Sequence, residues 1–125
     1  MRTLQAFEFM LQPEFAALAS LRRALSAWLA LARVEERARV DVVLATHEAA
    51  ANALEHSDLA QPVAVYAQLA DSLVTVEISN QGGWKVPSFT DNDRGRGLLL
   101  IDKLVSELEI QTDDRGTTLR LLYRT

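Results

Sequence analysis

Apolar and polar positions along the chain follow two different periods, and the changes between them divide the sequence into elements. From Glu14 to Arg33, apolar side chains recur at three- and four-residue steps, which predicts one face of a helix. That face consists of Leu18, Leu21, Leu25, Trp28 and Ala32. Pro13 suits the first turn of this helix, because the N–H that proline lacks has no partner there. We predict a break at residues 34–38.

Helical periodicity returns in two later segments. A second helix is predicted from Glu36 to Ser57, with acidic residues at its start favouring the helix dipole. We expect its apolar face to consist of Val40, Val43, Leu44, His47, Ala51 and Leu54. A third, apolar helix is predicted from Leu98 to Val105.

The remaining segments alternate between apolar and polar residues, which is typical of strands. Thr3 to Leu11 predicts a short strand. Four further strands form two predicted hairpins, with residues 63–69, 74–78, 108–112 and 117–123 as their arms. The first hairpin turns at Asp71-Ser72 and the second at Asp114-Arg115-Gly116.

The predicted order of elements is β-α-α-β-β-loop-α-β-β. This order favours an α+β, two-layer sandwich with one mixed, mostly antiparallel sheet and helices on one of its faces. We expect residues 1–125 to form a single domain. Asn80 to Gly95 is the one long irregular stretch, and loops of that length are often functional lids.

Composition narrows the class of protein. Apolar residues make up 49% of the 125 positions and charged residues 24%, which is typical of a globular domain. The formal net charge of −4 argues against sequence-independent binding to nucleic acid. The chain has no cysteine, and no stretch approaches the roughly 20 apolar residues of a membrane span. We therefore expect a cytoplasmic protein without direct contact to nucleic acid or membrane.

Two groups of residues carry candidate chemistry. Glu48, Asn52 and Glu55 share one face of the second predicted helix and lie among alanines, so a ligand could approach the helix closely. A solvated helix face is the alternative interpretation. Gly95-Arg96-Gly97 precedes the third helix, whose N-terminal N–H groups could bind an anion together with Arg94 and Arg96. An ordinary flexible loop is the alternative there.

The order of these motifs resembles the GHKL superfamily of ATP-binding domains, most closely the anti-sigma-factor serine/threonine kinases of bacteria. The segment from His47 to His56 is similar to the N-box of that group. The resemblance implies a Bergerat-type sandwich with a short ATP lid that binds ATP and Mg²⁺. It also implies that Asn52 binds the metal and that Glu48 is the general base.

Further motifs continue the resemblance. Asp93 to Leu98 is similar to the phosphate-binding G2 box, which implies nucleotide contacts from Arg94, Gly95, Arg96, Gly97 and Leu98. Gly116-Thr117-Thr118 resembles the closing motif of the family, and we assign Thr118 to the adenine end.

One box departs from the family pattern. Asn80 occupies the position of the aspartate that accepts a hydrogen bond from the adenine amino group, whereas Gly82 matches the glycine of that box. An asparagine carbonyl can accept the same bond, but it is neutral and lacks charge assistance. The resemblance thus leaves both an active and a degenerate nucleotide site open.

The function expected from this resemblance is an ATP-dependent protein serine/threonine kinase that is also an anti-sigma factor in a partner-switching system. Its implied partners are a sigma factor and an anti-sigma antagonist protein that carries the serine, and a homodimer is implied as well. The alternative is a non-catalytic module that sequesters a regulator. The catalytic piece of a two-component histidine kinase is a third interpretation, which the absence of a second domain in the sequence disfavours.

Overall fold

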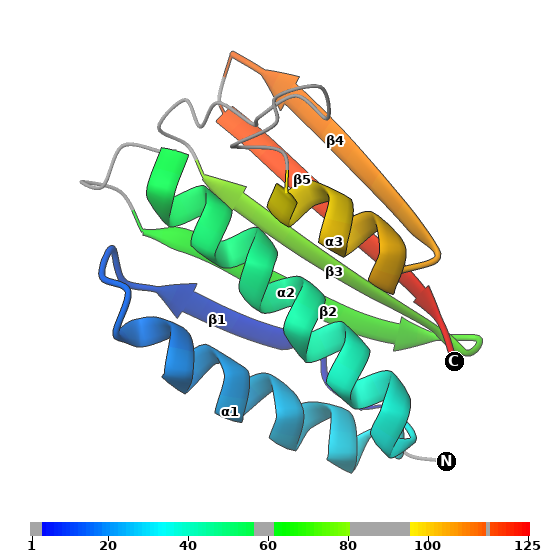
Figure 1. Cartoon of the computed structure of the whole chain (residues 1–125). Coiled ribbons are helices and arrows are strands. Elements are labelled where there is room, and N and C mark those ends of the chain that lie inside the picture. The colour runs from blue at the N-terminus through cyan, green and yellow to red at the C-terminus, as the bar shows by residue number, and fades with distance from the viewer. Residues whose placement is uncertain (1–3, 57–61, 81–95, 115) are drawn as a thin grey trace.

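The computed structural model describes residues 4–56, 62–80, 96–114 and 116–125. Within these residues, three helices cover one face of a five-stranded sheet (Figure 1). The helices are α1 (Ala17–Leu31), α2 (Glu36–His56) and α3 (Arg96–Leu104). The strands are β1 (Phe7–Leu11), β2 (Val63–Ala70), β3 (Leu73–Asn80), β4 (Glu107–Asp113) and β5 (Gly116–Arg124). The predicted α+β, two-layer architecture and its element order are confirmed.

The sheet has the strand order β1-β2-β3-β5-β4. Each of its four pairings is antiparallel, which confirms the predicted mostly antiparallel sheet, although no parallel pair occurs among the described strands. The central pairing joins β3 to β5, with Ile78 opposite Leu119 at its middle. It connects two hairpins, β2–β3 and β4–β5, whose strands are neighbours in the sequence.

Local backbone chemistry explains where the first hairpin turns. Asp71 and Ser72 both have positive φ angles, 51° and 64°, and the flanking residues Ala70 and Leu73 are register partners. Two central residues with positive φ form the type I′ geometry that matches the twist of the flanking strands. The predicted turn at Asp71-Ser72 is therefore confirmed.

The end of α1 is a Schellman motif. Arg33 has a φ of 62° and donates its N–H to the carbonyl of Ala30, while Val34 donates to the carbonyl of Leu29. These two bonds satisfy carbonyls that the end of a helix leaves without partners. Val34 is buried just after the turn, which anchors the connection to α2.

α1 packs its predicted apolar face onto β1 and the core. Leu21 and Leu25 on that face are fully buried, as is Leu29 beside it. The rings of Trp28 and Phe7 lie 5.9 Å apart, and Trp28 Nε1 donates a hydrogen bond to the Gln5 carbonyl at 2.9 Å.

The predicted apolar face of α2 is largely wrong. Val40 and Leu44 are 59% and 39% exposed, Val43, His47 and Ala51 are half-buried, and only Leu54 is buried. The face that packs on the sheet consists instead of Ala38, Val42, Ala45, Ala49 and Ala53. α2 is enclosed by the sheet and by α1 and α3 on its flanks, so small side chains allow the close packing that larger ones would prevent.

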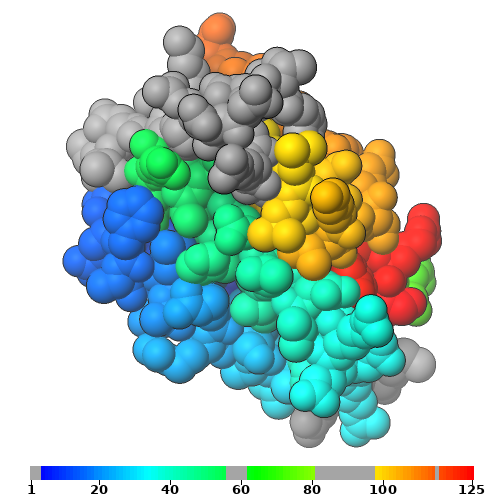
Figure 2. All heavy atoms as spheres, in the orientation of Figure 1, coloured from blue at the N-terminus to red at the C-terminus, as the bar shows by residue number. Residues whose placement is uncertain are grey.

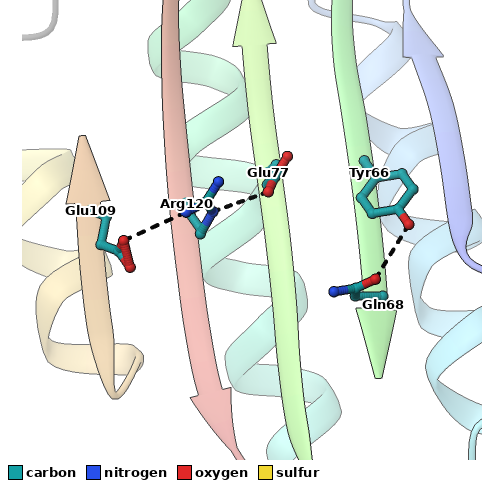
Figure 3. Close-up of polar contacts among 5 residues, drawn as sticks. All are labelled: Tyr66, Gln68, Glu77, Glu109 and Arg120. Atoms are coloured by element: carbon teal, nitrogen blue, oxygen red, sulfur yellow. Dashed lines mark hydrogen bonds and ion pairs between the residues drawn. The ribbon is translucent and has the colours of Figure 1, made fainter. Parts of the chain in front are cut away.

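The other face of the sheet carries polar side chains that contact one another (Figure 3). Arg120 Nε donates to Glu77 Oε1 at 3.0 Å, and Arg120 Nη1 lies 3.7 Å from Glu109 Oε2. Tyr66 also lies on this face and donates its hydroxyl to Gln68 at 3.3 Å. The partly exposed ion pairs add little stability. None of the helices in the described ranges is long and apolar enough to span a membrane.

Candidate functional site

Buried polar side chains gather at one end of the sandwich. The C-terminal end of α2, the end of β3, and the beginnings of α3 and β5 lie at this end (Figure 1). Asn52 of α2 is 7% exposed, and Asn80 of β3 and Thr117 of β5 are each 2% exposed. Polar side chains are seldom fully buried in a core that otherwise consists of apolar residues, so three of them at one end mark a candidate site.

Asn80 and Thr117 form the pair at the sheet side of this site. They are register partners across β3 and β5, and both are buried on the helix-covered face. The Thr117 hydroxyl lies 3.3 Å from that of Thr112 on β4. A buried amide and a buried hydroxyl thus stand next to each other where two strands meet.

Thr118, the threonine assigned to the adenine end, lies on the other face of the sheet. It is paired with Ser79, and successive residues of a strand point to opposite faces. The candidate threonine is therefore Thr117. Strand alternation could have identified it, because Leu119 and Leu121 are apolar and share its face.

Glu48 and Asn52 lie on the flank of α2 that faces away from α1. Asp41 is seven positions before Glu48 and shares the same stripe of the helix, since seven residues make about two turns. Asp41 Oδ2 accepts a hydrogen bond of 2.9 Å from the Tyr123 hydroxyl on β5. This contact directs the start of the stripe toward β5, and α3 also packs against α2. Glu48 is half-buried and is one turn from the buried Asn52.

The same hydrogen bond fixes the start of α2 against the end of β5. Burial raises the pKa of Tyr123 above 10.0, and the hydrogen bond to Asp41 and the charges of Asp41 and Glu35 raise it further. The positive charge of Arg37 lowers the pKa of Tyr123. The Tyr123–Asp41 contact, which lies outside the candidate site, therefore helps to fix the orientation of the helix that carries Glu48 and Asn52.

α3 begins two residues earlier than the predicted start at Leu98. Its first turn contains Arg96, Gly97 and Leu98, so their backbone N–H groups belong to the end of the helix that favours anions. The Leu98 side chain is fully buried and anchors this turn in the core, so it could contact a ligand through its backbone alone. The predicted site residues Gly82, Arg94 and Gly95 lie outside the described residues.

The donor set fits a magnesium ion that is shared with a phosphate ligand. Asn52 can supply one amide oxygen, a ligand type that suits Mg²⁺. In the described parts of the chain, no group of three or more His, Asp or Glu side chains could hold a metal. Mg²⁺ usually needs no such cage, because water and substrate phosphates complete its coordination.

Figure 2 shows how α2 is set between α1 and α3, with its C-terminal half directly beside α3. The arrangement can therefore hold a ligand between the polar flank of α2, the start of α3 and the Asn80–Thr117 pair. A nucleotide has the matching chemistry, with a phosphate end for the helix start and a hydrogen-bonding base for the amide.

Comparisons with known proteins agree with this geometry. Residues 11–123 match the histidine kinase-like ATPase domain family. The crystal structure of the RsbU and RsbW domains of Rv1364c from Mycobacterium tuberculosis is similar, with a TM-score of 0.76 and 26% sequence identity. That match covers 96% of this chain and 32% of the other. The chain belongs to the histidine kinase-like ATPase domain family, and this membership implies ATP as its ligand.

Proposed function

We propose that the chain is an ATP-dependent protein serine/threonine kinase that acts as an anti-sigma factor in a bacterial partner-switching system. The observation that carries this proposal is the placement of Glu48 and Asn52 on the flank of α2 directed toward β5 and α3. The fold it shares with a protein that contains an RsbW domain supports the same class of function.

The proposed ligand contacts follow from the chemistry of each group. Asn80 would accept a hydrogen bond from the adenine amino group through its side-chain oxygen, and Thr117 would support that end of the site. The first turn of α3 would bind the phosphates through its N–H groups. Asn52 would hold Mg²⁺, which neutralises charge on the phosphates when it is bound.

Glu48 is the proposed general base for phosphoryl transfer. Its carboxylate would take the proton of a serine hydroxyl on the partner protein while the serine oxygen bonds to the γ-phosphorus. The bond from that phosphorus to the β–γ bridging oxygen breaks, and ADP leaves with the electron pair. The proposed products are a phosphoserine on the partner and ADP.

The proposed partners are a sigma factor and the antagonist protein that carries the serine, and the proposed assembly is a homodimer. They rest on the resemblance of the N-box and the G2 box to the anti-sigma-factor kinases and on the structural likeness to a protein with an RsbW domain.

Calorimetric titration with ATP in the presence and absence of Mg²⁺ tests the nucleotide site. We expect saturable, Mg²⁺-dependent binding between micromolar and millimolar dissociation constants, about −4 to −8 kcal/mol. Thr117→Val and Thr118→Val are a matched pair on opposite faces of β5. Loss of one hydrogen bond should weaken binding about 2- to 13-fold in the first variant and leave it unchanged in the second.

A second candidate function is a non-catalytic module that sequesters a regulator, and the neutral Asn80 favours it. Absence of saturable binding with millimolar Mg-ATP would support this module over the kinase. If Asn80 does face the base, Asn80→Asp should tighten binding by about 1 kcal/mol through charge assistance. Unchanged or weaker binding in that variant would contradict this placement of Asn80.

A further inference from the structure

A groove of about 400 Å³ runs between α1 and the first half of α2. It lies in the blue-to-cyan part of Figure 2. Val40, Val43 and Leu44 line it. Val40 and Leu44 are 59% and 39% exposed, so this apolar stripe has no cover among the described residues.

This stripe is a second apolar face on one helix. α2 already packs its alanine face on the sheet. The large apolar residues Val40 and Leu44, on the side of α2 away from the sheet, are therefore not needed to bury the helix. A cluster of exposed Val and Leu side chains at helical spacing, inside a groove, is the kind of surface that binds another protein segment.

Charges along the rim indicate what the segment should carry. Ser26 and Arg22 of α1 and Glu36 and Arg39 of α2 border the groove. Arg22 Nη1 donates to Nδ1 of His47 at 2.9 Å. Across the described parts of the chain, neither arginine forms an ion pair with a carboxylate. Two guanidinium groups without a carboxylate partner among the described residues, against the one carboxylate of Glu36, make the rim complementary to acidic side chains.

The shape of the surface disfavours a second copy of the same groove as the occupant. Two concave surfaces of like net charge do not complement each other, whereas a helix presents a convex apolar ridge that fits between two helices. We propose that the α1–α2 groove binds an amphipathic helix of a partner protein, with apolar residues at three- and four-residue steps and acidic residues beside them. This inference does not depend on the proposed kinase activity, because the groove lies between α1 and the first half of α2, whereas the proposed adenine and phosphate contacts come from β3, β5 and α3.

Fluorescence anisotropy with two labelled peptides tests the proposal on the full chain. Each probe is a designed amphipathic peptide of about 18 residues, long enough for a helix, with the same leucine ridge and either glutamate or lysine on its flanks. We expect the glutamate peptide to bind at least about tenfold more tightly than the lysine peptide. Equal binding of the two peptides, or no binding of either, would overturn the proposal.

Variants of the groove separate its apolar floor from its charged rim. Val40→Ser combined with Leu44→Gln should weaken the glutamate peptide about tenfold or more, whereas Leu31→Gln, an exposed leucine outside the groove, should not. Circular dichroism confirms that each variant is folded.

The rim is tested by charge reversal. Arg22→Glu combined with Arg39→Glu should reverse the peptide preference, and Arg23→Glu on the same helix should preserve it. A preference that does not respond to the double reversal would show that the rim does not contact the peptide and would contradict the proposal.

Sedimentation velocity tests whether a second copy of the chain, rather than a partner helix, occupies the groove. If the chain forms a dimer that the Val40→Ser and Leu44→Gln substitutions dissociate, the groove is an interface between copies and the proposal is wrong. An oligomeric state that these substitutions leave unchanged supports a helix from a partner. Mg-ATP binding serves as an independent readout and should be the same in all groove variants.

Discussion

The two flanks of α2 differ in chemistry although they belong to one helix. The flank toward α3 carries Asp41, which accepts a hydrogen bond from Tyr123 of β5, and the candidate site residues Glu48 and Asn52. The flank toward α1 carries Val43 and the buried Thr46 beside an open apolar groove. Between them, the alanine face holds the helix on the sheet.

The position of a residue around α2 therefore indicates its role better than the composition of the helix does. The small residues of the sheet-facing side allow close packing, which leaves both flanks near neighbouring helices. Polar residues on one flank then face a site, and large apolar residues on the other line a surface. Substitutions on each flank should therefore have effects of different kinds.

The largest effect is expected from Glu48→Ala on the α3 flank. Loss of a general base commonly lowers the rate about 10²- to 10⁴-fold, while binding of Mg-ATP should stay nearly intact. The measurement is phosphate transfer to a cognate serine-bearing partner, together with nucleotide affinity. Glu55→Ala, on the same helix but exposed, is the matched control. Transfer at the parent rate in the Glu48 variant would show that the base assignment is wrong.

Asn52→Ala should weaken Mg-ATP binding as well as turnover. The loss of one bond to a charged ligand corresponds to roughly 1.5–3 kcal/mol, or about 13- to 160-fold in affinity. Asn52→Asp keeps an oxygen ligand for the metal and should retain Mg²⁺-dependent binding. Calorimetry with and without Mg²⁺ compares the two variants. An alanine variant that binds like the parent would exclude Asn52 from the metal site.

Tyr123→Phe tests the structural contact on the same flank. Loss of the hydrogen bond to Asp41 should lower the free energy of unfolding by about 1 kcal/mol at neutral pH. Because the folded-state pKa of Tyr123 is raised, the unfolded state loses the proton first as pH rises above 10.0. The contribution is therefore complete below that pH and is lost as pH rises through the raised folded-state pKa.

Urea denaturation across this pH range gives the difference between the parent and the Phe variant. Tyr66→Phe is the control, since its hydroxyl bonds to Gln68 on the exposed face of the sheet. A parent–variant difference that grows above pH 10.0 would contradict the direction of the pKa shift.

The smallest effect is expected on the α1 flank, from Thr46→Val. The Thr46 hydroxyl is fully buried and has no hydrogen-bond partner among the described residues. Its replacement by a methyl group of similar shape should stabilise the fold by up to about 1 kcal/mol. Thr46→Ala removes volume as well and should not stabilise. Thermal unfolding distinguishes these outcomes, and a destabilised Val variant would indicate that the hydroxyl is satisfied.

Much of the fold could be predicted because its elements have regular periods. The face of α1 and both hairpins follow from apolar spacing and turn residues, as Leu21, Leu25 and the Asp71-Ser72 turn show. The face of α2 could not be predicted by the same rule. Hydrophobicity predicts that Val40 and Leu44 are buried, whereas the residues that pack on the sheet are mostly alanines. The local sequence does not show that α2 contacts a sheet and two helices.

Part of the candidate site was also predictable. The resemblance to the family motifs pointed to Glu48, Asn52 and Asn80, which the structure places on α2 and at the end of β3, with Asn52 and Asn80 buried. The choice of Thr118 over Thr117 was wrong because the motif contains two threonines and only the strand register decides which face each one occupies. The groove beside α1 was not predictable, since its two walls come from separate helices.

The β3–β5 pairing also has a consequence for how the chain folds. The hairpins β2–β3 and β4–β5 join sequence neighbours, whereas β3 and β5 meet only after a long loop has closed, at an entropic cost. Contacts of high sequence separation slow folding, so we expect the hairpins to form early and to dock late. Asn80 and Thr117 lie on opposite sides of that seam. A ligand that binds both residues would link the two hairpins. It would therefore stabilise the folded chain most strongly against separation of β3 from β5.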